Sequence, residues 1–130
     1  MSGQIVEWFY HDLAGIQPNE NVPGFKSIVI RPAIVGNLKW VKAAYDSING
    51  RIVSEWQQKG QSVSLHVIIP PNIAAVVAVP GIDANSVMEG GHPATQSTGV
   101  RFIRQDGAYL LYQVGSGEYM FQSTLYARTP

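Results

Sequence analysis

The chain has 130 residues, the size of one domain, and folding at this size buries roughly two-thirds of the surface that the unfolded chain exposes. Nine basic residues balance nine acidic ones, and Lys and Arg form no runs, so we expect no nucleic-acid partner. The absence of cysteine excludes disulfides, thiolate nucleophiles and thiolate zinc sites, and no motif predicts a cofactor.

The N-terminus, Met1-Ser2-Gly3-Gln4, has neither a basic segment nor a long apolar one. We therefore predict no signal peptide and, if Met1 is the natural start, a cytoplasmic protein. The most apolar stretch, Val63 to Val79, is interrupted by Pro70-Pro71-Asn72. A membrane-spanning helix needs about 20 consecutive apolar residues, so we expect a soluble chain with no membrane partner.

One helix is predicted, over residues 4–14. Apolar residues recur there at helical spacing, and Gly15 followed by Pro18 favours an end to the helix. The apolar stripe consists of Ile5, Val6, Trp8, Phe9 and Leu13. An uncovered stripe of this kind favours association, so we expect it either to pack on the rest of the chain or to form a homodimer through Ile5, Trp8, Phe9 and Leu13.

The rest of the chain has the pattern of strands joined by short turns. Strands are predicted at residues 25–31, 38–45, 51–57, 63–69, 73–79, 100–104, 109–114 and 119–125. Asn49-Gly50 and Asp106-Gly107 are typical of β-hairpin turns, and residues 81–99 are predicted to be a surface loop. The chain is therefore predicted to be all-β, an antiparallel β-sandwich or jelly roll of about eight strands with one short N-terminal α-helix.

Alternation divides the predicted strands into two faces. In the strand at residues 51–57, Ile52, Ser54 and Trp56 share one face, and Val53, Glu55 and Gln57 share the other. In the strand at residues 63–69, His66 takes an outward position. The three histidines, His11, His66 and His92, lack the spacing of a metal motif, so we predict ordinary surface histidines and no metal site.

Several aromatic residues could stack on sugar rings if they shared an exposed sheet face. We take Trp40, Tyr45 and Trp56 as candidate carbohydrate-binding residues. The alternative is that they belong to the core, because alternation places most of the aromatic residues among apolar neighbours. Glu7 lies on the less apolar side of the predicted helix, one turn before His11, as a solvated surface carboxylate would.

A series of short motifs resembles the bacterial α-L-rhamnosidase family. The motifs are IVEWFYHDLAGI at residues 5–16, PGFK at 23–26, AYDSINGRI at 44–52, EW at 55–56, VIIPPNIAAV at 67–76, MEGG at 88–91 and VGSGEYMF at 114–121. They occur in the family's order over nearly the whole chain, although Gly90 stands where the family's turn usually has Ser. The resemblance implies the end of an α/α catalytic barrel at residues 1–16 and a C-terminal β-sandwich domain at residues 17–130.

The resemblance also implies a function for the parent enzyme. Members of this family are similar to inverting glycosidases, which need two carboxyl groups about 6.5–9.5 Å apart. Glu7 matches an acidic position before the Trp and becomes a candidate general base, whereas the rest of the barrel lies outside this sequence. We therefore expect a non-catalytic accessory or scaffold domain, with no activity of its own. The alternatives are a free-standing carbohydrate-binding module, with rhamnose-containing glycans as partners, and a self-associating structural protein.

Overall fold

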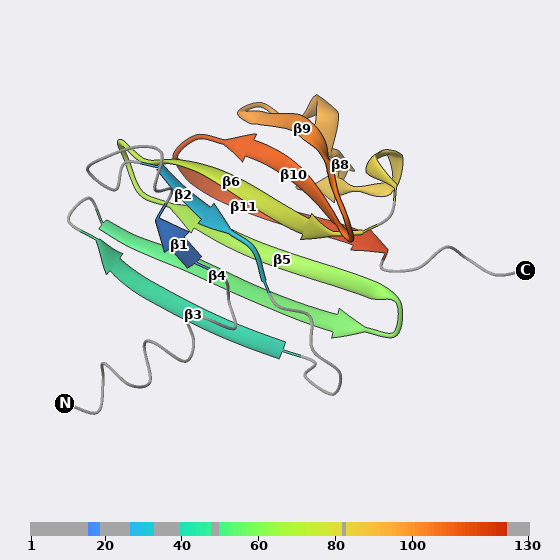
Figure 1. Cartoon of the computed structure of the whole chain (residues 1–130), viewed down its shortest axis with the longest axis horizontal. Coiled ribbons are helices and arrows are strands. Elements are labelled where there is room, and N and C mark those ends of the chain that lie inside the picture. The colour runs from blue at the N-terminus through green and yellow to red at the C-terminus, as the bar shows by residue number, and fades with distance from the viewer. Residues whose placement is uncertain (1–15, 19–26, 33–39, 48–49, 82, 125–130) are drawn as a thin grey trace, which may run out of the picture.

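The computed structural model describes residues 16–18, 27–32, 40–47, 50–81 and 83–124. Within these residues the chain forms two packed sheets (Figure 1). The five-stranded sheet has the order β1 (Ile16–Pro18), β2 (Ser27–Ile30), β6 (Ala74–Pro80), β10 (Tyr109–Val114) and β9 (Val100–Asp106). The six-stranded sheet has the order β3 (Trp40–Ser47), β4 (Gly50–Lys59), β5 (Ser62–Ile69), β11 (Gly117–Thr124), β7 (Met88–Glu89) and β8 (His92–Pro93).

This architecture confirms the predicted all-β sandwich. The structure adds three strands of only two or three residues, β1, β7 and β8, which are too short to produce a detectable alternation in sequence. One pairing also departs from the antiparallel pattern, because β2 runs parallel to β6 with Ser27 opposite Ala74. A parallel pair needs a long crossover, and the hairpins β3–β4–β5 of the opposite sheet supply it.

The stretch predicted as a loop over residues 81–99 has more structure than expected. It contains two 3₁₀ turns, η2 (Ala84–Ser86) and η3 (Ala94–Gln96), around the small β7–β8 hairpin. β7 pairs with β11 through Phe121 and Glu89, so this segment extends the six-stranded sheet.

The predicted helix at residues 4–14, and with it Glu7 and the stripe Ile5, Trp8, Phe9 and Leu13, lies outside the described residues. Ile16, the last residue of the predicted N-terminal unit, begins β1. Among the residues that the structure describes, there is no helix with the length and apolar character that crossing a bilayer demands.

The core fills the space between the two sheets. Its largest completely buried side chains are Trp56, Tyr112, Phe121, Ile28, Ile30, Ile52, Leu65 and Leu110. The rings of Tyr112 and Phe121 meet across the sheets with centroids 5.6 Å apart, and Phe102 packs on Tyr112 at 5.4 Å. Such tilted aromatic pairs add about 0.5–1.5 kcal/mol each beyond the burial of their area.

The two predicted hairpins form as expected. Gly50 begins β4 at a φ of +131°, and a Cβ atom at this position would lie 2.9 Å from Cβ of Pro70. Only glycine meets both conditions, which explains why a glycine begins β4, while Asn49 lies outside the described residues. Gly107 links β9 and β10 with a φ of +60° and open space around it.

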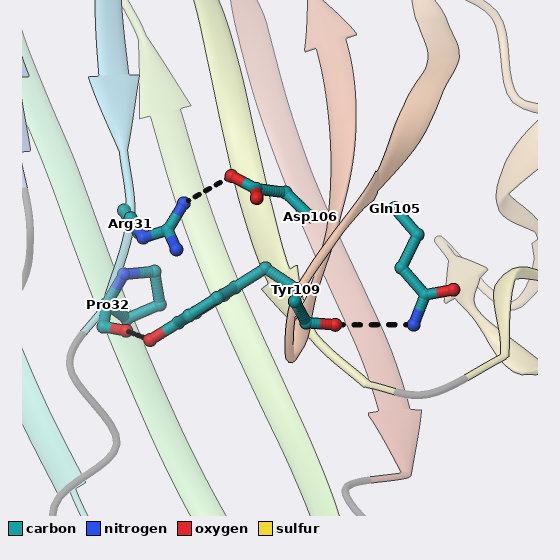
Figure 2. Close-up of polar contacts among 6 residues, drawn as sticks. Arg31, Pro32, Gln105, Asp106 and Tyr109 are labelled. Carbon is teal, nitrogen blue, oxygen red and sulfur yellow. Dashed lines mark hydrogen bonds and ion pairs between the residues drawn. The ribbon is translucent and has the colours of Figure 1, made fainter.

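A polar clasp joins β2 to the β9–β10 hairpin on the outer side of the five-stranded sheet (Figure 2). The Arg31 guanidinium carbon lies 4.3 Å from the centroid of the Tyr109 ring, and Arg31 Nη1 lies 3.1 Å from Asp106 Oδ2. The Tyr109 hydroxyl donates to the Pro32 carbonyl at 2.7 Å. These contacts span β6, which lies between β2 and β10, and hold the two sides of the sheet together.

Candidate functional site

The candidate site lies on the outer face of the six-stranded sheet, on the strands β3, β4, β5 and β11. Register places outward-facing side chains there, most of them polar, in two rows that cross the strands. One row is Trp40, Gln57, Ser64 and Gln122, and the neighbouring row is Lys42, Glu55, His66 and Met120. The residues between them along each strand, such as Trp56, Leu65 and Phe121, point into the core. Alternation thus makes one face of each strand apolar and leaves the other polar.

Polar contacts connect four strands across this face. Trp40 Nε1 donates to Glu55 Oε2 at 2.8 Å. Glu55 Oε1 lies 3.8 Å from His66 Nδ1, and His66 Nε2 lies 2.6 Å from Glu118 Oε2. His66 and Glu55 are only about a quarter exposed, with 24% and 23% of their side-chain surface accessible. We call the connected group Trp40–Glu55–His66–Glu118 the outer-face network.

A shallow hollow of about 230 Å³ lies beside the network. It is lined by Glu55, Gln57, Ser64, His66, Met120 and Gln122. Within the described part of the chain, the side chains of Gln57, Ser64 and Gln122 form no hydrogen bond, so their amides and hydroxyl remain available to a ligand. The hollow therefore combines fixed acceptors on Glu55 with free donors and acceptors on its neighbours.

The outer-face network is not arranged as a metal centre. The two ring nitrogens of His66 point in opposite directions, one towards Glu55 and the other towards Glu118. A single ion cannot accept ligands from both ends of one imidazole, and no group of three or more His, Cys, Asp or Glu among the described residues could hold a metal.

The network is not arranged as a glycosidase centre either. In such a centre the sugar and the attacking water occupy the space between the two carboxyl groups. The ring of His66 fills the space between Glu55 and Glu118. The Glu118 side chain is also 67% exposed, so this face offers no pocket that excludes water from the reacting atoms.

The structure separates the three aromatic candidates. Trp40 lies on the outer face with 52% of its surface exposed. Trp56 is completely buried among the apolar residues of the core, so its ring is not accessible to a sugar, and Tyr45 is half-buried against the same core. Trp56 and Tyr45 therefore belong to the core, which was the alternative to sugar stacking. Their strands present them on the inner face, where Trp56 lies opposite Val41 and Tyr45 lies opposite Ile52.

His66 takes the predicted outward position, but its contacts go beyond the sequence-based expectation. His66 is not an ordinary surface histidine, since two carboxylates contact its ring. His92 is exposed and lies at the small β7–β8 hairpin, where its Nδ1 is 3.0 Å from the Gly90 carbonyl oxygen. His11 lies outside the described residues.

Sequence reasoning missed most of the site. Alternation puts Glu55, Gln57 and His66 on outward positions, but it does not show which residues of β5 and β11 face each other. That register depends on the pairing of β5 with β11, which brings His66 next to Glu118 from 52 residues away.

The fold and its open polar face define a two-sheet β-sandwich module. A family model described as the bacterial alpha-L-rhamnosidase C-terminal domain matches residues 15–93. The chain belongs to this family.

Full-length relatives carry the same module as a small part of a longer chain. An alpha-L-rhamnosidase of Streptomyces avermitilis is 32% identical over 120 residues, which are 92% of this chain and 11% of that protein. The crystal structure of a Streptomyces avermitilis alpha-L-rhamnosidase complexed with L-rhamnose superposes with a TM-score of 0.75 at 30% identity, covering 88% of this chain and 10% of the other. A structure of alpha-L-rhamnosidase from Dictyoglumus thermophilum gives 0.73 at 31% identity, covering 88% and 13%. The chain thus spans about a tenth of the length of the relatives that it matches.

Proposed function

We propose that this chain is a non-catalytic accessory domain of the α-L-rhamnosidase type, which supports a catalytic domain without supplying the reacting groups. The observation that carries the proposal is the chain's share of its relatives, since it corresponds to only 11% of the Streptomyces avermitilis enzyme. A glycosidase centre that uses two carboxyl groups needs a site that holds the sugar between them.

The described residues fit a supporting role. Their side chains form a continuous core between two sheets, and the only carboxylates that approach each other on the outer face of β4, β5 and β11 in the described part of the chain are separated by His66. A base without its acid, and without an enclosed site, gives no useful turnover. Glu7, the candidate base, belongs to a motif whose partner groups lie elsewhere in an enzyme of this family.

The proposal is tested with the purified chain and nitrophenyl α-L-rhamnoside. We expect the release of nitrophenol to equal that of buffer, while the homologous enzyme of Streptomyces avermitilis serves as the positive control. The variant Glu7→Gln should behave like the wild type. Release that increases with the concentration of the chain and disappears in Glu7→Gln would show that the chain is catalytic by itself.

A further inference from the structure

The outer face of the six-stranded sheet has the chemistry of a ligand site that the supporting role does not explain. A face that only covers the core needs solvated polar groups and no fixed geometry. Here the Trp40 indole is held by its hydrogen bond to Glu55, and Glu55 in turn lies against His66. Pre-organised groups of this kind lower the entropy that a ligand loses on binding.

The second observation is the placement of apolar surface: Met120 lines the hollow, and Trp40 lies beside it, opposite Gln57 and hydrogen-bonded to Glu55. Trp40 lies on β3, and Met120, which is 40% exposed, lies on β11. Three strand spacings separate these strands, which gives a width of about 14 Å. Between β3 and β11 lie the Gln57 amide and the Glu55 carboxylate on β4 and the Ser64 hydroxyl on β5, and the Gln122 amide lies beside Met120 on β11.

This combination of two apolar side chains with polar groups near them matches the surface of a sugar. A pyranose ring has C–H groups on its faces and hydroxyls around its edge, so aromatic and thioether side chains contact the former while amides and carboxylates bind the latter. The width accommodates one or two such rings. A protein segment as occupant would require a larger apolar surface than the two exposed residues provide.

Charge narrows the class of sugar. Glu55 and Glu118 place two carboxylates on this face, and Lys42, opposite Glu55 on β3, contributes one positive charge. An anionic sugar would approach two carboxylates in an open, hydrated site and would be repelled. A neutral sugar is not repelled by these carboxylates, and its hydroxyls can donate hydrogen bonds to Glu55.

We infer that the hollow beside Trp40 and Glu55 binds one or two neutral pyranose units of a glycan. The ligand packs against Trp40 and Met120 and forms hydrogen bonds with Glu55, Gln57, Ser64 and Gln122. His66 is a positioning residue, because it holds Glu55 from the side away from Trp40. The site adds glycan binding to the proposed accessory role and does not depend on it, since a binding face on β3, β4, β5 and β11 requires no catalytic partner.

The test is a titration of the ¹⁵N-labelled chain with L-rhamnose, a rhamnosyl-glucose disaccharide and D-glucuronate. The chain contains three tryptophans, and the indole N–H signal of Trp40 is identified by its loss in Trp40→Phe. We expect saturable shifts of this signal and of the Gln57 side-chain amide with the neutral sugars. The dissociation constant should be on the order of 1 mM, since an open site of this size forms few contacts. D-Glucuronate should bind several-fold more weakly.

Two variants and one matched control make the result specific. Trp40→Ala should weaken binding roughly tenfold, because the apolar wall is lost, and Gln57→Ala should weaken it several-fold. Ile103→Ala is the control, since Ile103 is similarly exposed, at 44%, but lies on β9 of the other sheet. Its affinity should equal that of the wild type.

Three results would overturn the inference. They are an absence of shifts up to tens of millimolar neutral sugar, shifts that persist unchanged in both Trp40→Ala and Gln57→Ala, and tighter binding of D-glucuronate than of L-rhamnose. None of these results bears on the accessory role, which the nitrophenyl rhamnoside assay tests separately. Release of nitrophenol would contradict that role and leave the binding site intact.

Discussion

Trp40 and Trp56 lie on neighbouring strands, yet they have opposite environments. Trp56 on β4 is completely buried, whereas Trp40 on β3 is half exposed and donates a hydrogen bond to Glu55. The cause is register, because Trp56 lies opposite Val41, one residue after Trp40, and successive residues of a strand point to opposite faces. One residue type therefore serves the core on one face and is available to a ligand on the other.

The largest expected difference between the two faces is in the free energy of unfolding, when the indole of Trp56 or of Trp40 is removed. Trp56→Ala should lower the free energy of unfolding by about 3–5 kcal/mol, since it leaves a cavity in the packed core. Trp40→Ala should change it by less than about 1 kcal/mol, as substitutions at exposed positions usually do. Chemical denaturation of both variants measures the difference. Equal losses would mean that the outer face contributes to stability as much as the core does.

A smaller effect is expected at a polar group of the inner face. The Ser123 hydroxyl on β11 donates to the carbonyl of Pro80 on β6, and both residues are buried. Ser123→Ala leaves that carbonyl without a partner and should cost about 1–3 kcal/mol. Ser64→Ala is the matched control, because Ser64 lies on the outer face without a hydrogen bond to a described residue, and it should be nearly neutral. A neutral Ser123→Ala would show that the two sheets do not depend on this contact.

The smallest effect concerns the pH dependence of stability. Burial, with a further contribution from Asp83, raises the pKa of Tyr112 to about 12. The unfolded chain releases this proton above pH 10 and the folded chain retains it, so stability is full below pH 10 and falls as the pH rises towards 12. The loss between pH 10 and pH 11 is about 1 kcal/mol.

Tyr112→Phe isolates this contribution. The Tyr112 hydroxyl is buried and has no hydrogen-bond partner among the described residues, so its removal should leave the stability at pH 8 unchanged or slightly higher. Thermal unfolding of the wild type and of Tyr112→Phe at pH 8 and pH 11 gives the difference between their alkaline losses. If both proteins lose the same stability, Tyr112 ionises as easily in the fold as in the unfolded chain.

The sequence predicts those features of the fold that depend on neighbours along the chain. Alternation separated Ile52 and Trp56 from Glu55 and Gln57, and the structure confirms that division. The β3–β4 hairpin was also predictable, because the glycine that begins β4, Gly50, is required by backbone geometry and by the contact with Pro70.

Features that depend on distant parts of the chain were not predictable in the same way. The parallel pairing of β2 with β6 and the contact of His66 with Glu118 both need a register between segments far apart in sequence. Which of the three aromatic candidates faces the core also depends on the opposite sheet, which covers Trp56 completely and leaves Trp40 half exposed.

The parallel pairing of β2 with β6 has a consequence for the order in which the chain folds. The strands β3, β4 and β5 are joined by hairpins and need only local contacts, so they can form early. β2 precedes them in the chain and can pair with β1, yet it cannot pair with β6 until all three strands have been made. A nascent chain emerging from the ribosome therefore carries β2 unpaired with β6 while β3, β4 and β5 form their hairpins, and the six-stranded sheet is completed only when β11, which follows every strand of the five-stranded sheet, pairs with β5.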